Sequence, residues 1–115
     1  MRLLFRICFA FMLVGAGLLI LARGLQAAPP DSAGDNYRTK CSMCHGPDGK
    51  GFSAIKTPNF TDPKWQASKK DAELLDAIKN GRKDTMMKGF SDKLKEDEIN
   101  SLVKYIRSLN SSKKK

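Results

Sequence analysis

Three neighbouring residues, Cys41, Cys44 and His45, have the types and the spacing for cofactor chemistry. Their C-x-x-C-H pattern is the attachment signature of c-type haem. At the end of a helical turn, two thiols three positions apart can reach the two vinyl groups on one edge of a porphyrin and add to them as thioethers. The histidine that follows then lies beneath the ring, where its imidazole can reach the iron. The motif therefore predicts one covalent haem c, held by Cys41 and Cys44, with His45 as an axial ligand of the iron.

Other uses of the two thiols agree less well with the sequence. A structural zinc site needs four Cys or His ligands, and residues 28–115 contain only these three. A thioredoxin-like dithiol requires a βαβ context, and no alternating strand pattern is evident in the sequence. A plain disulfide between Cys41 and Cys44 is a further alternative that no other feature supports.

The iron of an electron-transfer haem needs a second axial ligand, and the chain has no second histidine. The remaining choices are a methionine thioether, a lysine, a tyrosine or water. Met43 lies inside the attachment motif, and two other methionines lie near the N-terminus. Met86 and Met87 remain, in a glycine-bounded stretch downstream. One of these two is expected to complete a His/Met coordination.

Residues 1–27 have the pattern of a secretory signal peptide. Arg2 and Arg6 precede a run of 16 apolar or glycine residues, and an alanine-rich exit follows. An uncleaved membrane anchor is the alternative, because 16 residues approach the lower limit of a spanning helix. Both interpretations place the rest of the chain in the periplasm, free or anchored to the inner membrane. That rest divides into a linker, a haem domain and a basic tail, at residues 28–33, 34–110 and 111–115.

The elements that must position these residues are helices. Helical spacing of apolar residues predicts helices at residues 34–44, 68–80 and 96–109. The stretches 45–63 and 81–90 are rich in residues that favour turns, and they are expected to be loops. The predicted fold class is all-α, with three main helices and long loops around one haem, preceded by an N-terminal hydrophobic helix. So small a core is expected to need its cofactor.

The charge is strongly positive, with 21 Lys+Arg against 12 Asp+Glu and a formal net charge of +9. The 41% hydrophobic content excludes wholesale disorder and a multi-span membrane protein. Residues 79–95 hold six basic side chains against two acidic ones. This segment predicts a positive rim near the haem edge that steers acidic redox protein partners or respiratory complexes. Nucleic acid is not expected as a partner. The basic residues are Lys79, Arg82, Lys83, Lys88, Lys93 and Lys95.

The sequence resembles the small, exported, single-haem class I cytochromes c of bacteria. The likeness lies in Tyr-x-x-x-C-x-x-C-H-G at 37–46, Thr-Pro-Asn-Phe at 57–60 and Leu-Val-Lys-Tyr-Ile-Arg-Ser-Leu at 102–109. In that family the distal ligand often opens a Met-Pro-x-Phe sequence, and residues 87–90 match it with lysine in place of proline. The resemblance therefore implies Met87 as the distal ligand, with Met86 as the alternative.

The resemblance also implies contacts within the fold. The Pro58 carbonyl is expected to accept the second ring N–H of His45, and the first and last helices to cross, with Tyr37 against Leu102 and Tyr105. Ala33 replaces the usual glycine of that crossing.

Two further positions are open to interpretation. Lys95 replaces the usual Ser/Thr cap of the last helix, at a cost of about 1 kcal/mol. Trp65 is expected either to donate its indole N–H to a haem propionate or to pack as a plain aromatic.

The predicted function is that of a soluble, monomeric periplasmic electron carrier with no catalytic residue, which shuttles single electrons between respiratory redox partners. One alternative is a membrane-anchored cytochrome subunit of a larger oxidoreductase complex. Another is an open-site haem enzyme or gas-binding module, in which Met87 leaves the iron free.

Overall fold

The computed structural model describes residues 30–113. The hydrophobic segment at residues 1–27 lies outside this range. In the part of the chain that is described, no strand forms apart from an isolated bridge between Gly81 and Lys88, which confirms the all-α fold class. The helical elements are α2 (Pro30–Asn36), η1 (Tyr37–Cys41), α3 (Ser42–His45), η2 (Ser53–Ile55), α4 (Pro63–Ser68), α5 (Asp71–Asn80), α6 (Glu96–Ser108) and η3 (Ser111–Lys113).

None of the helices within residues 30–113 is both long enough and apolar enough to cross a membrane.

The helix predicted at 34–44 is one continuous helical path that begins earlier, at Pro30, and ends at His45. Its middle turn, η1, is a π-helix, in which the N–H of Ser42 bonds to the carbonyl of Tyr37. Such wide single turns occur frequently at functional sites. Here the wide turn ends at Cys41, the first residue of the predicted attachment motif.

The helix predicted at 68–80 is in fact preceded by a separate short helix. Asp62 caps α4, because its Oδ1 accepts the backbone N–H of Lys64 at 2.9 Å. Pro63 occupies the first turn, where a missing N–H costs nothing. α5 then begins at Asp71, and the Glu73 carboxylate accepts the backbone N–H of Lys70 at 2.8 Å.

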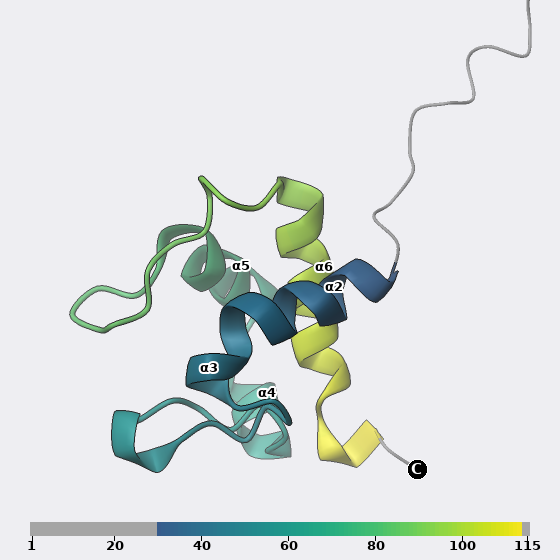
Figure 1. Cartoon of the computed structure of the whole chain (residues 1–115). Coiled ribbons are helices and arrows are strands. Elements are labelled where there is room, and N and C mark those ends of the chain that lie inside the picture. The colour runs from purple at the N-terminus through teal and green to yellow at the C-terminus, as the bar shows by residue number, and fades with distance from the viewer. Residues whose placement is uncertain (1–29, 114–115) are drawn as a thin grey trace, which may run out of the picture.

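The crossing of the first and last helices is confirmed, because α2 packs across α6 (Figure 1). Tyr37 and Leu102 are fully buried there, and the ring centroids of Tyr37 and Tyr105 lie 5.0 Å apart. Ala33 is buried at this crossing, so a methyl group fits where the family usually has none.

The side chain of Lys95, the residue before α6, forms no capping hydrogen bond, as the sequence indicated. Glu98 partly replaces that cap, since its Oε2 accepts the backbone N–H of Lys95 at 2.9 Å. Its other oxygen accepts the side-chain amide of Asn36 at 3.3 Å. The same carboxylate therefore secures the first turn of α6 and ties it to α2.

A polar hub centred on one buried side chain joins α4 and the start of α5 to α6. Gln66 is buried, and its Nε2 donates to the carbonyls of Phe60 and Ile106 at 2.7 and 2.8 Å. The Arg107 guanidinium donates to Gln66 Oε1 at 2.9 Å and to Asp71 Oδ1 at 2.7 Å. It also reaches two backbone carbonyls nearby. This hub holds the two short helices of the cavity wall against the last helix.

Candidate functional site

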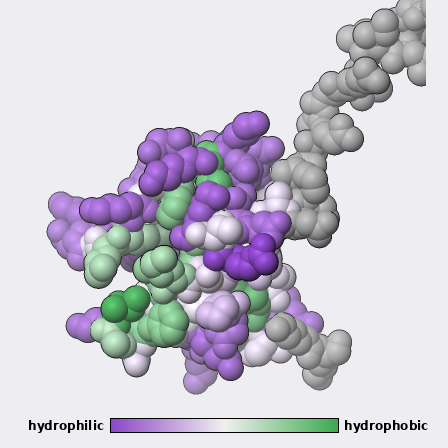
Figure 2. Space-filling model, in the orientation of Figure 1, coloured by the Kyte–Doolittle hydropathy of each residue, from purple (hydrophilic) through white to green (hydrophobic). Residues whose placement is uncertain are grey.

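A cavity of about 1010 Å³ lies between α3, the α4–α5 pair and the 81–90 loop. Pockets for large organic ligands in proteins commonly measure about 300–1,000 Å³ and are mostly apolar. Figure 2 shows hydrophobic residues gathered between two hydrophilic parts of one face. The cavity lining includes Cys41, Cys44, His45, Met86 and Met87, so the fold brings the predicted attachment motif and both candidate methionines to one place.

Cys41 and Cys44 both carry free thiols on the cavity wall. Cys41 closes the π-turn and is half-buried, and this burial raises the pKa of its thiol to about 11. Cys44 lies one helical turn further, on α3, and is exposed. Two free thiols three positions apart on one cavity wall fit the chemistry of thioether attachment to one edge of a porphyrin.

His45 is the last residue of α3, and its ring stacks on that of Phe60, with centroids 4.7 Å apart and planes 20° apart. Burial lowers the pKa of the imidazole, which favours the neutral form that binds metals. The predicted hydrogen bond to Pro58 is wrong: within residues 30–113, Nδ1 is buried and has no partner. The Pro58 carbonyl oxygen lies close to Gly51, where an added Cβ would be only 2.6 Å from it.

The backbone that follows His45 is closely held. The Gly51 N–H donates to the His45 carbonyl at 2.9 Å. The buried Tyr37 hydroxyl donates to the Gly46 carbonyl at 2.8 Å, with a longer contact of 3.4 Å to that of His45. The same burial raises the pKa of Tyr37, so its hydroxyl stays protonated as a donor. The family resemblance indicated Tyr37 as a packing residue only, and its polar role has no sequence signal beyond the choice of Tyr over Phe.

The two candidate methionines differ in their surroundings. Met86 is 83% exposed, whereas Met87 is half-buried and packs against the hydrophobic core. The backbone of Met87 is fixed on both sides, because its carbonyl accepts the Arg82 N–H at 3.1 Å and its N–H donates to Thr85 at 3.2 Å. A Cβ at Gly81 would come within 2.6 Å of the Met87 carbonyl. Met87 is therefore the better buried and the better fixed of the two methionines.

Trp65 lies on the cavity lining and packs against the core, with its ring centroid 4.9 Å from that of Phe60. The structure thus supports the aromatic packing expected of Trp65.

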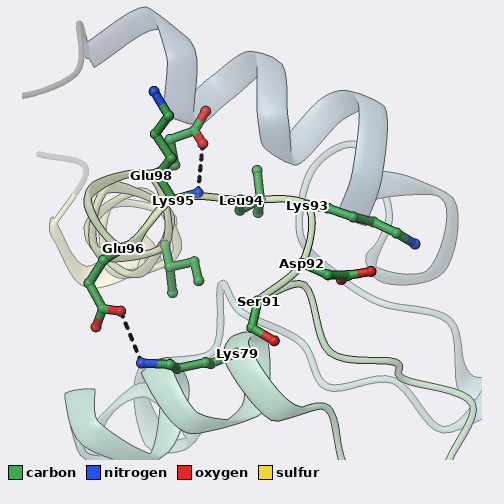
Figure 3. A pocket seen from close by; sticks show the side chains of 9 residues that line it. Lys79, Ser91, Asp92, Lys93, Leu94, Lys95, Glu96 and Glu98 are labelled. Carbon is green, nitrogen blue, oxygen red and sulfur yellow. Dashed lines mark hydrogen bonds and ion pairs between the residues drawn. The ribbon is translucent and has the colours of Figure 1, made fainter.

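The basic segment at residues 79–95, predicted as one positive rim, lies only partly on the cavity wall. Of its six basic residues only Arg82 and Lys88 line the cavity. Lys79, Lys93 and Lys95 line a separate depression of about 460 Å³ between α5 and α6, shown in Figure 3. There the ammonium group of Lys79 pairs with Glu96 at 2.9 Å.

Basic residues from other parts of the chain complete the lining of the large cavity. The full set of charged lining residues is five basic, Lys40, Lys56, Lys69, Arg82 and Lys88, and two acidic, Glu73 and Asp84. The cavity is therefore apolar inside and positive overall, which suits a flat apolar macrocycle that carries two carboxylates.

Comparisons with known proteins agree with this geometry. Residues 28–106 match the family described as "Cytochrome C oxidase, cbb3-type, subunit III". The FixP subunit of the cbb3-type cytochrome c oxidase of Bradyrhizobium sp. (strain ORS 278) is 31% identical over 77 residues, which cover 67% of this chain and 26% of that protein. The CcoP subunit of Rubrivivax gelatinosus is 36% identical over 69 residues, 60% of this chain and 22% of that protein. The chain thus spans about a quarter of the length of these relatives.

Solved structures show the same fold. The KustC0563 c-type cytochrome is 30% identical with a TM-score of 0.63, and the match covers 68% of this chain and 96% of that one. The c-type cytochrome NirC, 23% identical with a TM-score of 0.61, shares the fold over 73% of this chain and 94% of its own. The chain is therefore a class I c-type cytochrome that carries covalently bound haem c, and it belongs to the family of subunit III of cbb3-type cytochrome c oxidases.

Proposed function

We propose that this chain is the electron-carrying haem domain of a membrane-anchored respiratory oxidoreductase, facing the periplasm. The relatives that match it are subunits of cbb3-type cytochrome c oxidases. Because these relatives are oxidase subunits, they favour the anchored subunit over the soluble electron carrier that the sequence alone predicts. On this proposal residues 1–27 are the retained anchor.

Four residues of the cavity lining would bind the cofactor. Cys41 and Cys44 would hold the haem through thioethers, and His45 and Met87 would bind its iron. When bound, the haem supplies one-electron oxidation and reduction. The apolar lining excludes water, and a thioether ligand favours the reduced iron, so both features raise the reduction potential. No residue of the chain needs to act as an acid, a base or a nucleophile.

The observation that carries this proposal is the convergence at one cavity. The Cys-x-x-Cys-His motif and Met87 are separated by about 40 residues of chain, and both line the same apolar space. Met87 is also the better fixed and better buried of the two methionines. These contacts favour a closed His/Met centre over an open site for gas or substrate.

A spectrum of the oxidised protein tests the closed centre. A weak far-red sulfur–iron charge-transfer band is expected, together with no carbon monoxide binding by the reduced form. Ready carbon monoxide binding without that band would favour the open-site haem enzyme or gas-binding module. Alkaline pyridine reports covalent haem c independently of the axial ligands.

The intact mass of the mature protein tests the anchor. A membrane-bound product that retains residues 1–27 is expected. A soluble product that begins near Ala28 and carries one haem would contradict the anchored subunit and support the soluble electron carrier. That second candidate has one specific observation in its favour, since the KustC0563 c-type cytochrome consists almost wholly of this one fold.

A further inference from the structure

The imidazole of His45 has no hydrogen bond on Nδ1 that would fix its orientation. Nδ1 is buried and has no partner among residues 30–113, although a metal-bound histidine ordinarily donates this N–H to a polar group that fixes the ring. The orientation of the ring must then come from the surfaces that flank it and from the backbone that carries it.

The flanking surface is Phe60. Its ring stacks on the imidazole with the planes 20° apart, which limits tilting of the imidazole in one direction. Phe60 is itself buried and packs against Trp65, so it has little freedom to move. Stacking alone leaves the imidazole free to slide and to rotate in its own plane.

The backbone is held by Tyr37. Its side chain is 1% exposed, and its hydroxyl donates to the Gly46 carbonyl at 2.8 Å while lying 3.4 Å from the His45 carbonyl. The hydroxyl therefore holds the two peptide units that directly follow the Cα of His45. Tyr37 also opens the π-turn that ends at Cys41, so one wide turn carries both the tyrosine and the first thiol.

We propose that Tyr37 is a positioning residue of the haem centre, whose hydroxyl fixes the peptides after His45 and thereby sets the plane in which the imidazole meets the iron. It acts through His45 and touches no reacting atom. The proposal rests on the proposed ligation of the iron by His45. It assigns to a buried tyrosine the orienting role that the resemblance gave to the Pro58 carbonyl.

The variant Tyr37→Phe is suited to the test because it is expected to fold. The aromatic ring stays in the α2–α6 crossing, and both carbonyls keep another donor. The Gly51 N–H bonds to the His45 carbonyl at 2.9 Å, and the Gly49 N–H bonds to the Gly46 carbonyl at 3.2 Å. No buried acceptor is left wholly unpaired.

The experiment compares haem-loaded full-length proteins by NMR of the oxidised form and by redox titration. The spread of the paramagnetically shifted haem methyl resonances reports the orientation of the axial ligand planes. Tyr105→Phe is the matched control, because it removes a hydroxyl from the ring that lies 5.0 Å from Tyr37. Val103→Ala is the stability control, because this buried residue of α6 lies outside the cavity lining.

Tyr37→Phe is expected to change the haem methyl pattern and to shift the reduction potential. Tyr105→Phe and Val103→Ala are expected to leave both unchanged, although Val103→Ala lowers the unfolding temperature. A Tyr37→Phe protein that loses stability as Val103→Ala does, but keeps the wild-type methyl pattern and potential, would show that the hydroxyl is merely structural. Spectra of the wild-type protein that show no histidine ligand on the iron would instead overturn the proposed function, and with it the role of Tyr37.

Discussion

Single residues of the 81–90 loop show how burial distinguishes two identical side chains. Composition and spacing left Met86 and Met87 equivalent, and only the family resemblance separated them. The structure adds a physical difference, because Met87 packs against the core while Met86 is exposed. No periodicity in a glycine-bounded loop could have indicated which of two adjacent side chains points inward.

The two methionines are therefore expected to respond differently to removal. In the haem-loaded protein, Met87→Ala should abolish the far-red sulfur–iron band, let the reduced iron bind carbon monoxide and lower the reduction potential. Met86→Ala, the matched control one residue away, should leave all three unchanged, because its side chain is 83% exposed. Absorption spectra and redox titration decide the matter. Loss of the band in Met86→Ala alone would reverse the assignment.

His45 shows that a hydrogen-bond partner expected from a family resemblance does not always carry over to the matching residue. The C-x-x-C-H motif predicted its place on the cavity wall, because that place follows from local helical spacing. The bond to Pro58 depends instead on the path of the loop between residues 46 and 58. That path turns on positive-φ glycines and carries the Pro58 carbonyl to Gly51.

At the scale of elements, apolar periodicity predicted the two later helices well. The stripes of α5 and α6 face the core as expected, with Leu74, Ile78, Ile99 and Leu102 buried. The helix α4 was missed because its six residues are too few for a stripe. An Asp-Pro pair at residues 62–63 was its one available signal, since it is a capping residue followed by a favoured first position.

The hub around Arg107 is expected to contribute strongly to stability. Arg107→Lys keeps the charge but cannot reproduce the several hydrogen bonds to Gln66, Asp71 and the Lys69 carbonyl. The free energy of unfolding should fall by about 1–3 kcal/mol. Arg38→Lys is the control, because its ion pair with Asp35 is exposed and should be worth less than about 1 kcal/mol. Denaturant unfolding of both haem-loaded variants measures the difference, and equal losses would contradict a special role for the hub.

The start of α6 is expected to make stability depend on acidity. The hydrogen bond from the Lys95 backbone, followed by that from Asn36, holds the pKa of Glu98 below its ordinary value of 4.5. A carboxylate with a lowered pKa stabilises the fold fully above its unfolded pKa, and this contribution disappears as the pH falls through the folded pKa. The unfolding temperature of Glu98→Gln should therefore lie below that of the wild type at neutral pH and converge with it below about pH 4.5.

Asp97→Asn is the matched control for that experiment, since it removes a neighbouring charge but neither of the two hydrogen bonds to Glu98. A gap between Glu98→Gln and wild type that stays constant down to low pH would contradict the assignment.

Across the whole molecule, charges that are neighbours in sequence separate in space. Of the six basic residues at 79–95, two line the large cavity and three line the α5–α6 depression. Their place in the sequence could not reveal this, because the chain reverses direction within the 81–90 loop. The basic residues Lys40, Lys56 and Lys69 reach the cavity from other elements, which only the three-dimensional arrangement shows.

This separation predicts which charges guide an acidic redox partner. Reversing a charge on the cavity lining, with Lys88→Glu, should slow bimolecular electron transfer with an acidic partner protein by about tenfold or more at low salt, and the effect should shrink as salt is added. Lys93→Glu makes the same charge change in the same segment, but on the α5–α6 depression, and should have a much smaller effect. Stopped-flow rates over a salt series provide the measurement. Equal slowing by both variants would mean that only net charge matters.

The packing of α2 across α6 also has a kinetic consequence. The hydrogen bond between Asn36 and Glu98 joins residues 62 positions apart, so this part of the core closes only when both ends of the domain have come together. Contacts of such high sequence separation slow folding, because a long loop must close before they form. During that delay the thiols of Cys41 and Cys44 remain in an open chain. The cavity wall around the two thiols also includes Leu102 and Ile106, so the thiols stay open to the machinery of cofactor attachment until α6 docks.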